Sequence, residues 1–291
     1  MVYQTSVISI GASMQVFATC VQCWQRKGAP TSESFTVPYY DDRLAYVTCS
    51  QGHRSALLIQ SPKFEVLLES GAGALTDGYT MEAAASFSAA LERFFEFCVQ
   101  VFCETRKLPQ DVYELMFKEM ARQSERQIGA FLVLHALEVG KPYKLNQDIS
   151  TFRNSVIHKG QIPTPEDSKD FCSKVYKEIL TLSKTLLERF PDAYNEVIRR
   201  DLFSRSNKLP KDMPRATSTG TVFFRGQQED FDDALRNFAQ GRQVMGLAPS
   251  LWLQAIQQAT HPPQTKITAV LPPGAIRSTF AVSISSGEVQ R

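Results

Sequence analysis

Short hydrophobic runs alternate with polar turn segments between residues 15 and 70 of the chain. The turn segments are KGAP, DDR, SQGH and SPK, and the runs between and around them are QVFAT, SFTVPYY, LAYVTC, SALLIQ and FEVLL. Runs of this length, rich in β-branched and aromatic residues and bounded by glycine, proline or aspartate, are typical of short strands. We therefore expect residues 1–75 to form a small antiparallel β module.

The hydrophobic pattern takes on a helical period from about residue 80. Apolar residues recur there every three or four positions, as they do along one face of a helix. They are Phe87, Leu91, Phe94, Cys98 and Val101. Three further apolar residues, Phe95, Val99 and Phe102, widen the stripe beyond a single face. This width indicates that the helix is covered from two sides, and a dimer partner is one candidate for the second side.

Helical patterns continue to about residue 203. They include DVYELMFKEMAR, SERQIGAFLVLHALEVG and a segment from residue 146 to residue 158. Thr164, Pro165 and Asp167 then supply an N-cap, a first-turn proline and an early carboxylate for another long helix. We expect an α-helical bundle over residues 78–203, so the predicted fold class is α+β.

Two segments beside these units give weaker signals. The glycine-rich run SGAGALTDG lacks the spacing of a dinucleotide-binding loop, so we expect a flexible connection. The polar stretch SRSNKLPKDMPRATSTG is rich in helix breakers and predicts a linker. Weak helical patterns follow at residues 231–238 and 247–259, and β-like pieces at KITAVL and STFAVSISS. We treat residues 204–291 as a C-terminal extension without an assigned role.

Composition narrows the class of protein. Hydrophobic residues make up 43% of the chain and charged residues 21%, as in ordinary globular proteins. The net charge of +2 excludes a strongly basic coating protein, so any contact with nucleic acid should be local. No apolar run approaches the roughly 20 residues that cross a bilayer, and no positive region precedes an apolar stretch at the start. We expect a cytoplasmic protein without membrane association.

Four potential metal ligands form two closely spaced pairs in the β module. Cys20 and Cys23 belong to Cys-Val-Gln-Cys, and Cys49 and His53 to Cys-Ser-Gln-Gly-His. Thiolates and a neutral imidazole suit tetrahedral Zn²⁺, and hairpin turns would present each pair to one ion. The pattern resembles a zinc ribbon of Cys3His type, which implies a closed, structural zinc site. The alternative is that the cysteines are ordinary buried thiols and His53 a loop residue.

An arginine and a histidine with four residues between them lie where the helical pattern of residues 146–158 ends. Arg153, Asn154 and His158 lie in the segment FRNSVIHKG. The segment resembles the HEPN superfamily, which is marked by an Arg, four to six intervening residues and a His, often with Asn directly after the Arg, in a helical bundle. The resemblance covers about residues 80–200. It implies a metal-independent prokaryotic endoribonuclease, used as a toxin or in defence against phage, that acts as a homodimer with both motifs in one cleft.

These residue types suit RNA cleavage by attack of the 2′-hydroxyl on its own phosphate. Histidine exchanges protons near neutral pH, and arginine offers a planar cation to phosphoryl oxygens. On an ideal helix, five steps of about 100° place Arg153 and His158 roughly 140° apart. They should therefore not share a face, and a second subunit should complete the cleft. Asn154 lies one helical turn before His158, so we expect it to orient the imidazole.

Two functions remain open at this point. In the first, the chain is an RNA-cleaving enzyme whose zinc module and extension bind a regulatory protein partner, sense a trigger or restrain the site. In the second, it is a non-catalytic adaptor that dimerises through the bundle and binds protein or nucleic acid through the zinc module. A simpler role for the motif is an ion pair of Arg153 with an acidic neighbour and a helix-capping contact of His158. Glu92 is expected to be solvated or salt-bridged.

Overall fold

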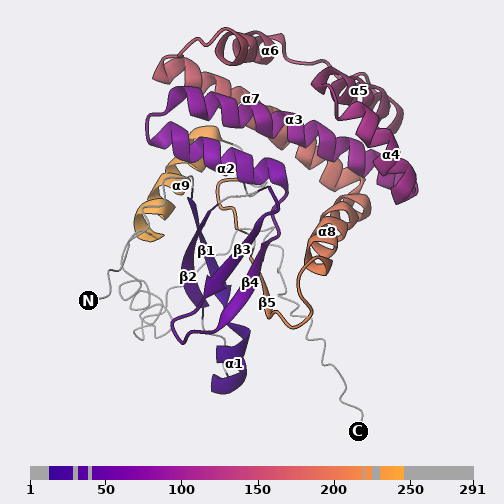
Figure 1. Cartoon of the computed structure of the whole chain (residues 1–291). Coiled ribbons are helices and arrows are strands. Elements are labelled where there is room, and N and C mark those ends of the chain that lie inside the picture. Colours follow the sequence, from indigo (N-terminus) through magenta and orange to yellow (C-terminus); the bar gives the residue numbers. More distant parts are fainter. Residues whose placement is uncertain (1–12, 29–31, 39–40, 219, 225–229, 246–291) are drawn as a thin grey trace, which may run out of the picture. The chain divides into compact units, whose positions relative to one another are not determined.

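A computed structural model of the chain describes residues 13–28, 32–38, 41–218, 220–224 and 230–245 (Figure 1). These residues belong to one compact unit, which ends at residue 247. Helices make up most of the described residues, and strands occur near the start of the chain and once more near residue 215. The predicted α+β class is confirmed at this level.

The described strands form two sheets. An antiparallel two-stranded sheet consists of β1 (Ser13–Thr19) and β2 (Ser32–Pro38). A three-stranded sheet has the order β3 (Leu44–Thr48), β4 (Arg54–Ile59) and β5 (Arg215–Ser218). The first two of these strands form an antiparallel hairpin, whereas β5 pairs with β4 in parallel. The β structure is thus not purely antiparallel, because a strand from the predicted linker completes it.

The central strand β4 is buried on both faces. Leu57 and Ile59 pack with Val66 of the following helix on one face, and Ala56 and Leu58 pack with Leu209 on the other. Successive side chains of a strand point to opposite faces, so both faces of a central strand must be apolar. This requirement explains the unbroken hydrophobic run ALLI.

Nine helices and one π-helical turn account for the rest of the regular structure in the described residues. Their bounds are α1 (Val21–Lys27), α2 (Lys63–Thr76), α3 (Thr80–Thr105), α4 (Gln110–Met120), α5 (Ser124–Val139), α6 (Gln147–Arg153), η1 (Asn154–His158), α7 (Pro165–Arg189), α8 (Pro191–Asn207) and α9 (Phe231–Met245). The Thr164 hydroxyl accepts the Asp167 backbone N–H at 3.1 Å, so the predicted N-cap of α7 is confirmed.

The long helix α3 organises the helical part and packs against α2, α5, α7 and α8. Its predicted apolar stripe is buried, since Phe87, Phe94 and Cys98 have no exposed surface. The second stripe is buried within the same chain, where Phe95 meets Phe131 of α5 with ring centroids 4.6 Å apart. A dimer partner is therefore not needed to cover this side of α3, which corrects the interpretation of its width.

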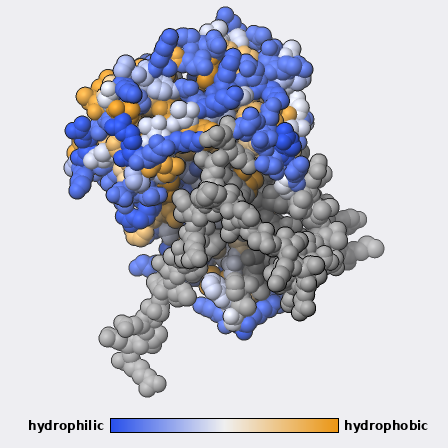
Figure 2. Space-filling model, turned by 180° about the vertical axis from the view of Figure 1, so that it is seen from behind, coloured by the Kyte–Doolittle hydropathy of each residue, from blue (hydrophilic) through white to orange (hydrophobic). Residues whose placement is uncertain are grey.

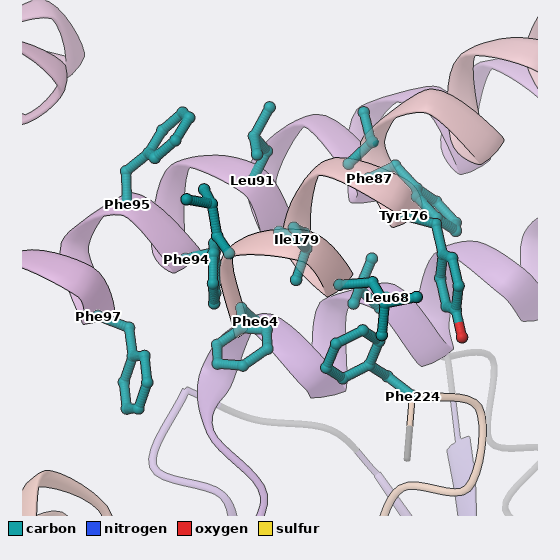
Figure 3. Close-up of a cluster of buried hydrophobic side chains, with 14 of the residues drawn as sticks. Phe64, Leu68, Phe87, Leu91, Phe94, Phe95, Phe97, Tyr176, Ile179 and Phe224 are labelled. Carbon is teal, nitrogen blue, oxygen red and sulfur yellow. The ribbon is translucent and has the colours of Figure 1, made fainter. Parts of the chain in front are cut away.

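An aromatic cluster joins α2, α3 and α7 to the segment that follows β5 (Figure 3). Phe64 lies edge-on to Phe94 with ring centroids 4.8 Å apart, and Phe224 reaches Phe64 at 5.9 Å and Tyr176 at 5.6 Å. Aromatic pairs in such geometries add to the stability gained from burying their area. The chain after β5 is thus part of the core.

Two local expectations from the sequence are wrong. The run FEVLL, expected as a strand, opens α2, and the glycine-rich run continues that helix to Thr76. Phe64, Leu68 and Ala72 are buried at helical spacing, and Gly71 leaves room for Phe87 of α3. A five-residue apolar run cannot separate strand from helix, so packing against α3 decided the outcome.

The polar stretch after residue 203 is also not a linker. Its first residues complete α8, which ends at Asn207, and residues 215–218 form β5. The predicted helix at residues 231–238 is confirmed as the first part of α9. The predicted helix at residues 247–259 and the β-like pieces after it lie outside the described residues.

On the face that Figure 2 shows, the visible part of the helical region is largely hydrophilic with scattered hydrophobic patches. None of the helices within the described ranges has the length and apolar character of a membrane span.

Candidate functional site

The four predicted metal ligands come together in space. The ligand atoms of Cys20, Cys23, Cys49 and His53 all lie within 4.8 Å of one another. Cys20 caps the N-terminus of α1 and Cys23 lies in its first turn, whereas Cys49 and His53 flank the turn between β3 and β4. Only the second pair is on a hairpin, because the residues after Cys20 coil into a helix. The expectation of two hairpin turns is thus wrong, although the grouping of the ligands is right.

The spacing of these atoms matches a tetrahedral site. The His53 Nδ1 atom lies 3.6, 3.3 and 3.5 Å from the sulfur atoms of Cys20, Cys23 and Cys49. The sulfur atoms of Cys23 and Cys49 are 3.8 Å apart, far beyond a disulfide bond. Bonds of about 2.3 Å to sulfur and 2.0–2.1 Å to nitrogen place sulfur pairs about 3.8 Å and sulfur–nitrogen pairs about 3.5 Å apart in a tetrahedron. The cluster can therefore hold one metal ion.

The local backbone holds Cys49 and His53 in place. The Cys49 N–H donates to the His53 carbonyl at 3.0 Å, and Gly52, whose φ is 79°, donates to the Cys49 carbonyl at 2.8 Å. A glycine is favoured at this left-handed position because it carries no Cβ. The turn therefore presents both ligands from one side.

The thiols of the cluster differ in acidity. Burial and hydrogen bonds with Cys20 and Cys49 raise the pKa of Cys23 to about 11. The pKa of Cys49 is instead lowered. Burial acts to raise it, but the backbone N–H groups of His53 and Gln51, together with the neighbouring thiols, have the larger effect. A bound cation would supply the charge needed to keep all three sulfurs deprotonated.

The arginine–histidine motif lies where α6 changes into a π-helical turn. Arg153 is the last residue of α6, and Asn154 to His158 form η1. A π-helix bonds residue i to residue i+5, so residues five apart lie nearly one above the other, as residues four apart do in an α-helix. The prediction that Arg153 and His158 point about 140° apart assumed an α-helix and does not hold for this turn.

Arg153 pairs with Glu92 of α3. The contact joins one terminal nitrogen of the guanidinium to one carboxylate oxygen, and the two side chains are 28% and 25% exposed. A guanidinium has five N–H donors, so a single contact leaves most of them available to another acceptor. Glu92 thus anchors the arginine without using up its donors.

His158 and Asn154 are both exposed. Within the described chain no hydrogen bond joins their side chains, so the expected orienting contact is not made. His158 is also not held by a helix end or a carboxylate here, which leaves both ring nitrogens accessible to a ligand. The turn thus ends in an exposed imidazole, and the partly exposed guanidinium of Arg153 belongs to the residue directly before the turn.

A second group of charged residues could not be recognised from the sequence pattern. Arg43 and Arg205 are buried and share the carboxylate of Asp201, with contacts of 2.6 and 3.0 Å. Arg43 lies in the segment DDR, which reads as a turn, and its partner is 158 residues away. No local pattern could pair them.

No protein-family model, curated protein or solved structure gives a significant match to this chain.

Proposed function

We propose that this protein is a metal-independent endoribonuclease of HEPN type that acts in the cytoplasm as a homodimer. The observation that carries the proposal is the π-helical turn that ends in the exposed His158. Arg153 directly precedes this turn, so four residues separate it from His158, as in the family motif. The packing of the turn against α3, inside a helical part of the chain, also supports it. A role as a toxin or in defence against phage rests on the resemblance alone.

The proposed reaction needs a base, an acid and a cation. A base removes the proton of the RNA 2′-hydroxyl, its oxygen attacks the adjacent phosphorus, and the bond from phosphorus to the 5′-oxygen breaks. An acid gives that leaving oxygen a proton, so the products are a 2′,3′-cyclic phosphate and a 5′-hydroxyl. His158 exchanges these protons, and Arg153 stabilises the charge on the phosphoryl oxygens.

A second copy of the chain would complete this site. The two proton transfers need an acceptor and a donor at opposite sides of the phosphorus, whereas one turn supplies one imidazole. Two copies of η1 facing each other would supply both groups, and two guanidiniums. Asn154, exposed beside Arg153, would then contact the RNA rather than the imidazole of its own chain.

We also propose that the cysteine–histidine cluster binds structural Zn²⁺. The tetrahedral spacing of three sulfurs and one nitrogen supports zinc over Mg²⁺ or Ca²⁺, which prefer oxygen ligands. All four positions would be filled by protein, so the ion would hold α1 to the β3–β4 turn without taking part in RNA cleavage.

One observation favours the alternative function of a non-catalytic adaptor. Glu92 partly neutralises Arg153, which weakens the attraction of this arginine for phosphate. In that case the bundle would dimerise and the metal-binding module would contact protein or nucleic acid.

Incubation of the purified chain with total RNA in EDTA separates the two functions. We expect wild type to cleave, and His158→Ala and Arg153→Ala to lose at least about 100-fold in rate, as expected for loss of a proton-transfer group or phosphate cation. Lys159→Ala, at the exposed residue directly after this turn, is the matched control and should retain activity. Cleavage that persists in His158→Ala contradicts the proposed chemistry, and an inactive wild type that binds RNA as a dimer supports the adaptor.

A further inference from the structure

A cavity of about 880 Å³ lies beside α3, on residues that the proposed RNA site does not use. Its walls come from β3 and the residues before it, the start of α2, α3, α8 and the two residues after α8. Small-molecule sites in proteins commonly have volumes of about 300–1,000 Å³ and combine apolar walls with a few polar groups. The cavity has this size and this mixture.

One wall carries two buried cations for one carboxylate. Of the other acidic residues that line the cavity, Asp41 and Glu96 pair with Lys63 and Arg93, and Asp42 is exposed. Arg43 and Arg205 are only 7% and 8% exposed, and both contact the single carboxylate of Asp201. Their other acceptors are neutral backbone carbonyls, with Arg43 donating to Ser61 at 2.9 Å and Arg205 to Ile59 at 2.9 Å. Burying a cation without a matching anion is costly, so this wall favours a negatively charged ligand.

Arg43 also has an unusual backbone conformation. Its φ of 50° lies in the left-handed region that non-glycine residues rarely adopt. Its buried Nε atom has no hydrogen-bond partner in the part of the chain that the structure describes. Strained backbone and unsatisfied buried donors tend to occur at functional sites, where binding rather than stability determines the conformation.

The rim of the cavity adds a cation and an aromatic ring. Lys208 lines it, is exposed and has no carboxylate partner among the described residues. Tyr46 points outward from β3 and is 61% exposed. The amides of Gln60 and Gln100 also line the cavity and can recognise hydroxyl or base-edge groups. An exposed aromatic ring next to cations is a common platform for a nucleobase attached to a phosphate.

We propose that this cavity binds a nucleotide, with its phosphate near Arg43, Arg205 and Lys208 and its base stacked on Tyr46. The nucleotide is either free or the end of an RNA strand. The inference does not depend on ribonuclease activity.

Isothermal titration of the full chain tests the proposal. The probes are AMP, ATP, inorganic phosphate, and one RNA oligonucleotide with either a 5′-phosphate or a 5′-hydroxyl, in the His158→Ala background so that RNA is not cleaved. Binding of AMP or ATP indicates a free nucleotide as ligand, and binding of the 5′-phosphorylated RNA alone indicates a strand end. Inorganic phosphate should bind at least tenfold more weakly than the best nucleotide probe, because it lacks the base.

Two exposed residues give variants that should fold. We expect Tyr46→Ala to weaken nucleotide binding about tenfold, or about 1.4 kcal/mol, and Lys208→Gln to weaken it about threefold with a reduced dependence on salt. The matched controls are Tyr79→Ala, equally exposed but outside the cavity, and Lys211→Gln. The proposal is overturned if neither a free nucleotide nor the RNA binds, if inorganic phosphate binds as well as the best of these probes, or if the controls lose as much affinity as Tyr46→Ala and Lys208→Gln.

Discussion

Replacing Gly71 with alanine tests the close packing of α2 on α3. A Cβ atom at this position would lie 2.5 and 2.7 Å from two ring carbons of Phe87 and 3.1 Å from the Cβ of Ser86. Phe87 is fully buried and cannot swing away. Overpacking of this kind costs about 1–3 kcal/mol, and the better helix propensity of alanine returns about 0.5–1 kcal/mol. We expect the free energy of unfolding to fall by about 1–2 kcal/mol.

Gly73→Ala is the matched control in the same helix. Its Cβ would meet only the Arg242 guanidinium at 3.8 Å, so the gain in helix propensity of about 0.5–1 kcal/mol should appear as added stability. Urea unfolding followed by circular dichroism should separate the two variants by about 2 kcal/mol, or about 1 M in midpoint for a slope near 2 kcal/mol/M. Equal midpoints, or a stabilised Gly71→Ala, would refute the packing of this helix.

Three further predictions concern the metal cluster, a buried carboxyl and the Arg153 anchor. Wild type should contain about one zinc per chain, Cys49→Ser should lose it, and Cys103→Ala should keep it, as measured by metal analysis. Burial raises the pKa of Glu65 to about 7, so the folded state binds the proton of this carboxyl group more tightly than the unfolded state does. The protonated carboxyl therefore stabilises the folded state by up to about 3 kcal/mol. This contribution is complete below about pH 4.5 and is lost as the pH rises through 7. Glu65→Gln should flatten that dependence in pH-dependent urea unfolding, and an unchanged slope would contradict the shift. Glu92→Gln removes the negative charge beside Arg153 and should tighten RNA binding in a filter assay at low salt, whereas unchanged or weaker binding would contradict the opposing role of this carboxylate.

Features determined by local pattern were predictable from the sequence. The apolar stripe of α3 and the Thr164 cap of α7 depend on residues within one or two helical turns. The pairing of Cys20 and Cys23 with Cys49 and His53 was predictable for a different reason. Thiolate and imidazole pairs at these spacings have few chemical uses, so residue type narrows the possibilities where periodicity does not.

Features determined by distant contacts were not predictable. The strand β5 pairs with β4 across more than 150 residues, and Arg43 meets Asp201 across 158. The π-helical turn is equally hidden, since one extra residue in a helical turn leaves no mark in the hydrophobic pattern. That turn changes the predicted directions of Arg153 and His158, and with them the geometry of the proposed site.

The chemical nature of the RNA ends tests the proposed function most directly. A defined single-stranded RNA is incubated in EDTA with wild type or with His158→Ala, and the products are analysed by mass spectrometry. We expect 2′,3′-cyclic phosphate and 5′-hydroxyl ends with wild type and intact RNA with His158→Ala. Fragments with 3′-hydroxyl and 5′-phosphate ends, or the same fragments from both proteins, would contradict cleavage by the Arg153 and His158 turn.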